Sequence, residues 1–207
     1  PDEHAPAVLD RRGNLVWYTD HDPDLVQTQL EFRVGGTGLI VLEQDKSRTD
    51  ASLSQLRFID WELDQEEIIS TWGAHHRFYQ HEDGTIAYLS LDIREWEDPE
   101  TGALWDVVGD TIVEISPEGE ETIVFSAWDA LTLGDVTEMD TTYYFGKVDW
   151  THANSLYYTV EDGTYLVSMG KLNTLVEVDR ATGEALDIIN EETYTFSENS
   201  TPFNYQH

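Results

Sequence analysis

The stretch THANSLYYTVEDGTYLVSMGKLNTLVEVDRATGEALDIIN, residues 151–190, decides the fold. It divides into four short apolar strands separated by turns, and apolar and polar residues alternate clearly in Leu175–Val178. Variants of the pattern occur at residues 27–72 and 75–129, the second with an insertion between HHRFYQHEDGTIAYLSLD and TIVEISPEGEETIVFSAWD. Repeats of this length with four strands each are typical of propeller blades. We therefore predict an all-β protein, a β-propeller of four-stranded antiparallel blades.

Turn residues set the boundaries of the predicted blades. Glycine-containing turns at 35–36, 83–84 and 162–163 separate the first two strands of each repeat, because glycine accepts the positive φ of a chain reversal. The pattern predicts a partial blade at 1–20, whole blades at 25–73, 74–130 and 149–190, and the opening strand of another at 203–207. The inserts 94–109 and 130–148 are expected to be polar and aromatic loops on one rim.

These boundaries imply an incomplete ring. A propeller must close on itself, since open sheet edges invite aggregation. We therefore expect residues 1–207 to form a single propeller domain that belongs to a larger ring. Pairing of the two ends into a small closed ring is the alternative.

The charge of the chain narrows its partners. The sequence carries 42 acidic and 11 basic residues, a formal net charge of −31. Such a surface repels phosphate, so we expect no nucleic acid and no anionic membrane as partner. We interpret the charge as a solvated surface. Calcium-holding loops are the alternative, but HEDG (81–84) and VEDG (160–163) are read as turns because no full EF-hand loop is present. No cofactor is predicted.

Other absences exclude further classes of protein. The chain has no cysteine, which excludes a disulfide scaffold, thiol catalysis and cysteine-based metal sites. Its apolar runs are too short for a transmembrane helix, so no membrane insertion is expected. The opening PDEHAPAVLD does not resemble a signal peptide, although a mature secreted chain would begin in the same way. Nothing in the sequence indicates an oligomeric state.

Three of the seven histidines occupy equivalent places in the repeat. His76, His152 and His207 each stand at the start of a predicted first strand, the strand that lines a propeller's central channel. We therefore expect three imidazoles to converge there, with His75 and His81 as mere neighbours. Converging imidazoles could hold a metal ion, or could serve as nucleophile and proton carrier. Composition leaves both readings open.

The sequence around these histidines resembles the bacterial arylsulfotransferases. The resemblance rests on DWTHANSLYY (149–158), YLVSMGKLNTLVEVDRATGE (165–184), HHRF with EDGT (75–85), VEISPEGE (113–120) and the closing PFNYQH (202–207). Members of that family are six-bladed propellers, mostly periplasmic or exported. The resemblance thus implies a periplasmic or extracellular protein of which this chain is the middle.

The resemblance also implies a reaction, the ping-pong transfer of a sulfuryl group from an aryl sulfate to a phenol acceptor. By position, His207 would be the nucleophile that takes the group covalently. His76 and His152 would act as acid/base groups or as partners of the sulfuryl oxygens, which suits a transition state that needs both a proton and hydrogen-bond donors.

The chain departs from the family pattern at two positions. Gly170 stands where the family carries the arginine that steadies the sulfuryl oxygens, and Arg77 stands where an acidic residue is expected. Lys171 is a candidate source of charge, but neighbouring residues of a strand point to opposite faces and lysine lacks arginine's planar fork. The alternative function is therefore a non-catalytic extracellular propeller that serves as a binding or structural scaffold.

Overall fold

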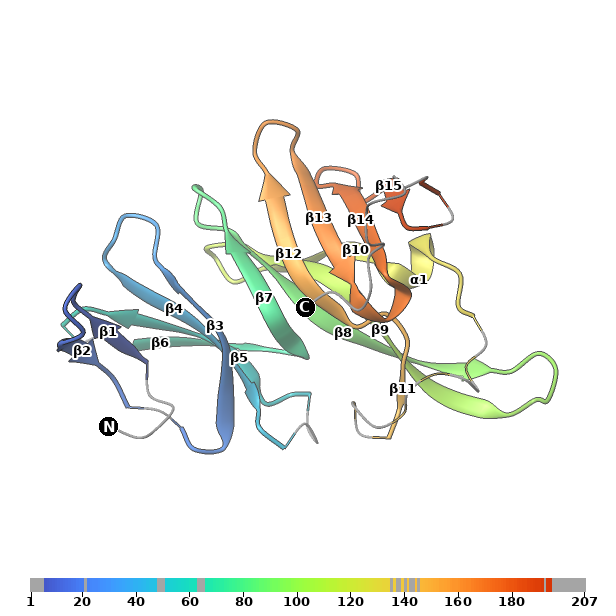
Figure 1. The fold of residues 1–207 in the computed structure, drawn as a ribbon, viewed down its shortest axis with the longest axis horizontal. Coiled ribbons are helices and arrows are strands. Elements are labelled where there is room, and N and C mark those ends of the chain that lie inside the picture. Colours follow the sequence, from blue (N-terminus) through green and yellow to red (C-terminus); the bar gives the residue numbers. More distant parts are fainter. Residues whose placement is uncertain are drawn as a thin grey trace. The chain divides into compact units, whose positions relative to one another are not determined.

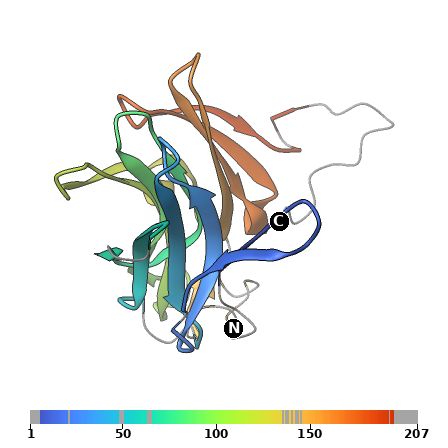
Figure 2. The ribbon, with the colours of Figure 1, turned by 90° about the vertical axis from the view of Figure 1, so that its left-hand side faces the viewer.

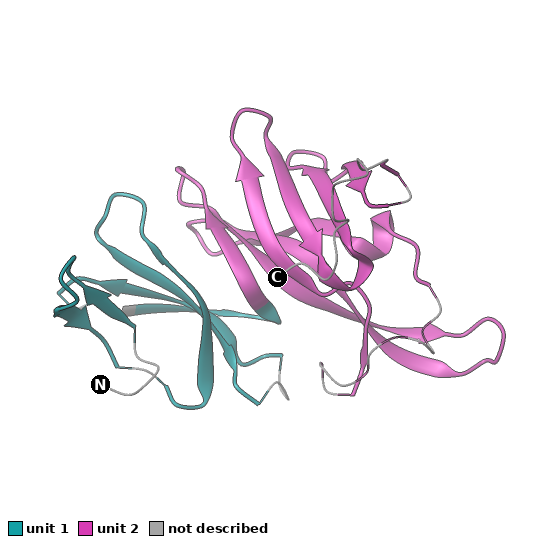
Figure 3. Ribbon diagram, in the orientation of Figure 1, with its two compact units in different colours: residues 1–74 teal, residues 75–207 magenta. Residues whose placement is uncertain are grey.

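The chain forms two compact units, residues 1–74 and 75–207 (Figure 3). The computed structural model describes residues 6–20, 22–47, 51–62, 66–134, 136, 139, 141, 144, 146–191 and 193–194. Strands dominate both units. Among the described residues, no helix is long and apolar enough to cross a bilayer.

The first unit contains a hairpin and a four-stranded antiparallel sheet, the latter in the order β3-β4-β5-β6 (Figure 1). Its strands are β1 (Ala7–Leu9), β2 (Leu15–Tyr18), β3 (Leu25–Phe32), β4 (Gly38–Asp45), β5 (Ser54–Asp60) and β6 (Glu66–Thr71). Strand β4 is buried over most of its length and carries the apolar core Leu39–Leu42. Gly38 begins it where a Cβ would lie 2.0 Å from the carbonyl oxygen of Ile59, so only glycine fits this approach of two backbones.

The second unit begins with a sheet in the order β10-β9-β8-β7. A short strand, β11, joins it by pairing in parallel with β9, where Asp149 lies opposite Val108. The elements are β7 (Ala74–Gln80), β8 (Ile86–Glu97), β9 (Leu104–Ile115), β10 (Glu121–Ser126), α1 (Ala127–Ala130) and β11 (Val148–Asp149).

A second sheet of this unit has the sequential order β12-β13-β14-β15 (Figures 1 and 2). Its strands are β12 (Ala153–Thr159), β13 (Thr164–Met169), β14 (Thr174–Asp179) and β15 (Ala185–Ile189), with the 3-10 turn η2 (Gly170–Leu172) between β13 and β14. Alternate residues such as Tyr165, Val167 and Val176 are fully buried and belong to one apolar core with Leu89 and Ile112 of the first sheet. Period-two alternation in the sequence is thus realised as one face packed on a neighbouring sheet.

The structure confirms the all-β class, the antiparallel sheets and the three predicted turns at 35–36, 83–84 and 162–163. A closed ring and the single domain of residues 1–207 stay predictions, and the opening strand at 203–207 lies outside the described residues.

One expectation was wrong. The insert 94–109 is not a loop, because β8 continues to Glu97 and β9 begins at Leu104. Trp96 pairs with Trp105 across this extension. A pair of large aromatic side chains on opposite strands favours continued pairing. The hairpin therefore extends through this segment despite its polar residues.

Candidate functional site

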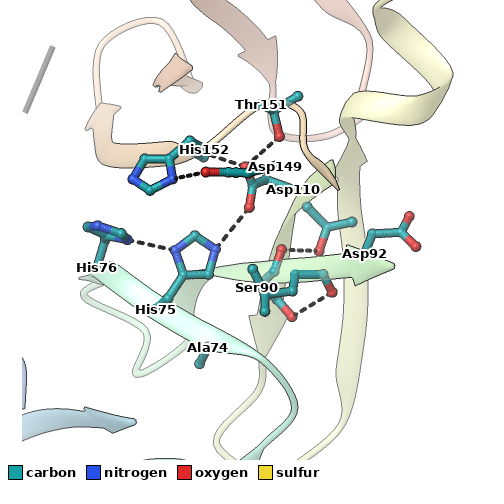
Figure 4. Close-up of polar contacts among 12 residues, drawn as sticks. Ala74, His75, His76, Ser90, Asp92, Asp110, Asp149, Thr151 and His152 are labelled. Atoms are coloured by element: carbon teal, nitrogen blue, oxygen red, sulfur yellow. Dashed lines mark hydrogen bonds and ion pairs between the residues drawn. The ribbon is translucent and has the colours of Figure 1, made fainter. Parts of the chain in front are cut away.

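Two of the three predicted channel histidines lie side by side. His76 is the third residue of β7, and His152 directly precedes β12. Their ring centroids are 5.3 Å apart and their planes are inclined by 69° (Figure 4). His152 is buried and His76 is half-buried. The repeat-relative positions seen in the sequence therefore correspond to neighbouring positions in space.

Both histidines have the same unusual backbone conformation. The φ angle is 53° at His76 and 49° at His152, within the left-handed region. A non-glycine residue there costs roughly 1–3 kcal/mol, and such conformations cluster at functional sites. The strain persists because surrounding contacts hold each ring, and these contacts differ between the two.

His152 is held directly by a carboxylate. Its Nδ1 lies 2.8 Å from Oδ2 of Asp149, and both side chains are fully buried. The parallel pairing of β11 with β9 fixes the backbone at Asp149. The N–H of Trp150 extends this pairing by donating to the carbonyl of Val108 at 3.1 Å. Asp149 is thus placed by the sheet and the ring is placed by Asp149.

His76 is held through a second histidine. Nδ1 of His76 lies 2.9 Å from Nδ1 of His75, whose Nε2 lies 3.0 Å from Oδ1 of Asp110 on β9 (Figure 4). The other carboxylate oxygen of Asp110 accepts hydrogen bonds from the Thr151 hydroxyl at 2.5 Å and from the Ala153 N–H at 2.6 Å. His75 is therefore a bridge between the buried carboxylate of Asp110 and the ring of His76.

Asp110 remains ionised despite its burial. Burial alone would raise its pKa, but the hydrogen bonds from His75, Thr151 and Ala153 act against that effect and the pKa is lowered. The carboxylate is consequently an acceptor at every one of these contacts.

Aromatic side chains complete the surroundings of the histidines. The ring of Tyr144 lies 6.3 Å from that of His75 and 5.9 Å from that of His152.

On β9, Gly109 precedes Asp110, and a Cβ at Gly109 would lie 2.6 Å from Nε1 of Trp128. This indole is fixed by donating to the carbonyl of Asp92 at 3.0 Å.

A family model described as Arylsulfotransferase (ASST) matches residues 1–202. The chain belongs to the arylsulfotransferase family. No curated protein matches its sequence.

Two solved structures are similar to this chain in fold. A protein of unknown function from Bacteroides caccae is similar with a TM-score of 0.54 and 12% identity, covering 91% of this chain and 55% of that one. The hydrazine synthase of Kuenenia stuttgartiensis is similar with a TM-score of 0.53 and 15% identity, covering 86% and 46%. The chain thus spans about half the length of these structures.

The position expected to correspond to the family arginine, Gly170, lies in a turn rather than a strand. Gly170 and Lys171 belong to η2, so the expected strand alternation, which would turn Lys171 away from the site, was wrong. The N–H of Gly170 donates to the carbonyl of His152 at 3.0 Å, and the N–H of Lys171 donates to that of Thr151 at 3.2 Å. The turn therefore packs its backbone directly on the segment that carries His152. Arg77 is exposed.

The remaining predicted groups are placed as follows. His207 lies outside the described residues, so its convergence with the other two histidines stays a prediction. Among the described residues, no group of three His, Cys, Asp or Glu side chains is arranged to hold a metal ion.

Sequence reasoning missed Asp110, Asp149 and Tyr144, and it treated His75 as a mere neighbour. Asp149 had a local signal, since it stands three residues before His152 in the segment DWTH. Asp110 had none, because it is 35 residues from His75 and joins the site only through sheet pairing.

Proposed function

We propose that this chain carries part of the active site of an arylsulfotransferase that moves a sulfuryl group from an aryl sulfate to a phenol. The observation that carries the proposal is the pair His76 and His152, repeat-equivalent, both left-handed, with ring centroids 5.3 Å apart. Membership of the family supplies the reaction class.

The reaction has two half-steps. A histidine nitrogen, assigned by resemblance to His207, attacks the donor sulfur; an N–S bond forms, the S–O bond to the phenol breaks, and the phenolate leaves with a proton from an imidazolium. An acceptor phenol then attacks the sulfur while an imidazole takes its proton, the N–S bond breaks and free histidine returns. His76 and His152 are the proton carriers in this scheme.

Intact mass spectrometry after brief incubation with 4-nitrophenyl sulfate tests the first half-step. The expected result is a gain of one sulfuryl group that maps to His207 and is discharged by added phenol. His207→Ala should abolish turnover, and His76→Gln should lower kcat by roughly 10²–10⁴-fold. The matched control is Arg77→Gln, the exposed neighbour of His76, which should keep activity. Full turnover by His207→Ala would refute the assignment of the nucleophile.

The wider setting follows the family. The sheets of this chain form part of a larger propeller ring, and the protein works in the periplasm or outside the cell, where aryl sulfates and phenols are its small-molecule partners. Cell fractionation of the native host measures the location, and recovery in the cytoplasm would refute it.

A second function, a non-catalytic binding or structural propeller, is favoured by one observation, the glycine at 170. Without the arginine, no guanidinium at this position neutralises the sulfuryl oxygens, and a single such donor is worth about 10²–10³-fold in kcat. Gly170→Arg should therefore raise sulfuryl transfer if the site is otherwise competent. No turnover with any aryl sulfate, before or after this substitution in a folded protein, would establish the scaffold.

A further inference from the structure

The hydrogen-bond chain behind His76 fixes where its proton lies. Ionised Asp110 only accepts, so Nε2 of His75 carries the proton of the 3.0 Å contact. At a pH where the rings are neutral, Nδ1 of His75 then bears the lone pair and, in the 2.9 Å contact, accepts from Nδ1–H of His76. The lone pair of the His76 ring is left on Nε2.

His152 has the same tautomer, but here the carboxylate contacts the ring directly. Asp149 accepts from Nδ1–H of His152 at 2.8 Å, which leaves the lone pair of that ring on Nε2 as well. Two repeat-equivalent histidines thus have the same tautomer, one through a carboxylate in direct contact and one through a carboxylate acting across a second histidine.

We propose that Asp110 and His75 are positioning residues that hold His76 in its Nδ1–H tautomer, so that His76 and His152 both present Nε2 as a proton acceptor. The catalytic consequence rests on the proposed function; the tautomers do not. In that reaction the two neutral rings correspond to the sulfurylated enzyme, after the leaving phenolate has taken a proton from an imidazolium and before the acceptor phenol gives its proton to an imidazole. When His76 takes that proton, its positive charge is stabilised by the Asp110 carboxylate through the hydrogen bonds of His75.

The surroundings of Asp110 provide a sharp test. Oδ2 is the acceptor for the backbone N–H of Ala153, a donor that cannot turn into an acceptor. In Asp110→Asn the amide oxygen must therefore remain toward Ala153, and the NH₂ group faces His75. That NH₂ donates to Nε2 of His75, which places the proton of His75 on Nδ1. His76 then has to accept at Nδ1 and carry its proton on Nε2.

The experiment is long-range 1H–15N NMR of the protein labelled with 15N-histidine, at a pH where the rings are neutral, with resonances assigned through single histidine variants. In the unaltered protein His76 and His152 should both be protonated at Nδ1. Asp110→Asn should reverse the tautomers of His75 and His76 and leave that of His152 unchanged. The matched control is Thr151→Val, which removes the 2.5 Å bond to the same carboxylate but keeps the Ala153 donor, and should reverse neither.

The proposal is overturned if His76 carries its proton on Nε2 in the unaltered protein, if His75 is an imidazolium there, or if folded Asp110→Asn keeps the original tautomers. The spectrum of the unaltered protein decides the matter even where Asp110→Asn does not fold. With aryl sulfate and phenol, Asp110→Asn should lower kcat by roughly 10²–10⁴-fold with KM little changed, because Asp110 does not touch substrate. Expected tautomers in a protein without turnover would refute the proposed function and support the positioning role.

Discussion

Replacing Tyr165 by phenylalanine tests the polar network that joins the two sheets of residues 75–207. The buried Tyr165 hydroxyl on β13 donates to Oε1 of Glu114 on β9 at 2.5 Å and lies 2.6 Å from Nε2 of His81. Arg180 completes the network with two bonds to Glu114, at 2.7 and 3.0 Å. One hydroxyl thus contacts Glu114 on β9 and His81 in the turn between β7 and β8.

The magnitude follows from what the substitution removes. A hydrogen bond to a charged acceptor contributes about 1.5–3 kcal/mol, and a buried donor left without its acceptor costs about 1–3 kcal/mol. The donor in question is Nε2–H of His81, a residue that is 5% exposed. Partial relaxation reduces the sum, so we expect Tyr165→Phe to lower the free energy of unfolding by about 2–4 kcal/mol.

Urea unfolding followed by circular dichroism and tryptophan fluorescence measures this loss. With a slope of about 2 kcal/mol/M, the midpoint should fall by about 1–2 M. Tyr157→Phe is the matched control, since Tyr157 is 61% exposed and the same change there should stay within about 0.5 kcal/mol. Equal midpoints for the two variants would refute the reasoning that the Tyr165 hydroxyl links the sheets.

Acid should weaken the same network. Burial and then the charge of Arg180 lower the pKa of His81 below its ordinary 6.5, and the bonds from Arg180 and Tyr165 outweigh burial to lower the pKa of Glu114 below 4.5. In both cases the unfolded chain binds a proton first, so stability is complete above about pH 6.5 and falls as the pH drops. Urea midpoints from pH 8 to pH 4 measure the decline; a midpoint that rises toward pH 5 would contradict it. Gly109→Ala should lower the free energy of unfolding by about 1–3 kcal/mol, because the new methyl meets the rigid Trp128 indole. A thermal melt measures it, and an unchanged Tm would show that the indole yields.

The sequence predicted the strands and turns well because these depend on local patterns. Alternation in Leu175–Val178 and glycine at 163 are visible within a few residues, and both are realised in the structure. The extended β8–β9 hairpin was missed because the Trp96–Trp105 pair forms only when two separated strands align.

The same distinction between local patterns and long-range contacts decides which site residues could be predicted. The places of His76 and His152 could be predicted because repetition marks equivalent positions. Asp110 could not, since its partners come from two other segments of the chain, at His75 and at residues 151–153, and its role exists only once β9 lies between them. The conformation of η2 was likewise invisible, because a glycine followed by lysine suits a strand end or a turn equally.

The parallel pairing of β11 with β9 makes the position of Asp149, which holds the ring of His152, independent of the insert before β11. Asp149 takes its register from Val108, and not from the length of the chain between α1 and β11. The place of His152 is therefore set by the sheet rather than by the segment that precedes β11. Tyr144, whose ring lies 5.9 Å from that of His152, belongs to the segment before β11. A substitution at Tyr144 should therefore change an aromatic contact of His152 without moving Asp149, the carboxylate that holds the same ring.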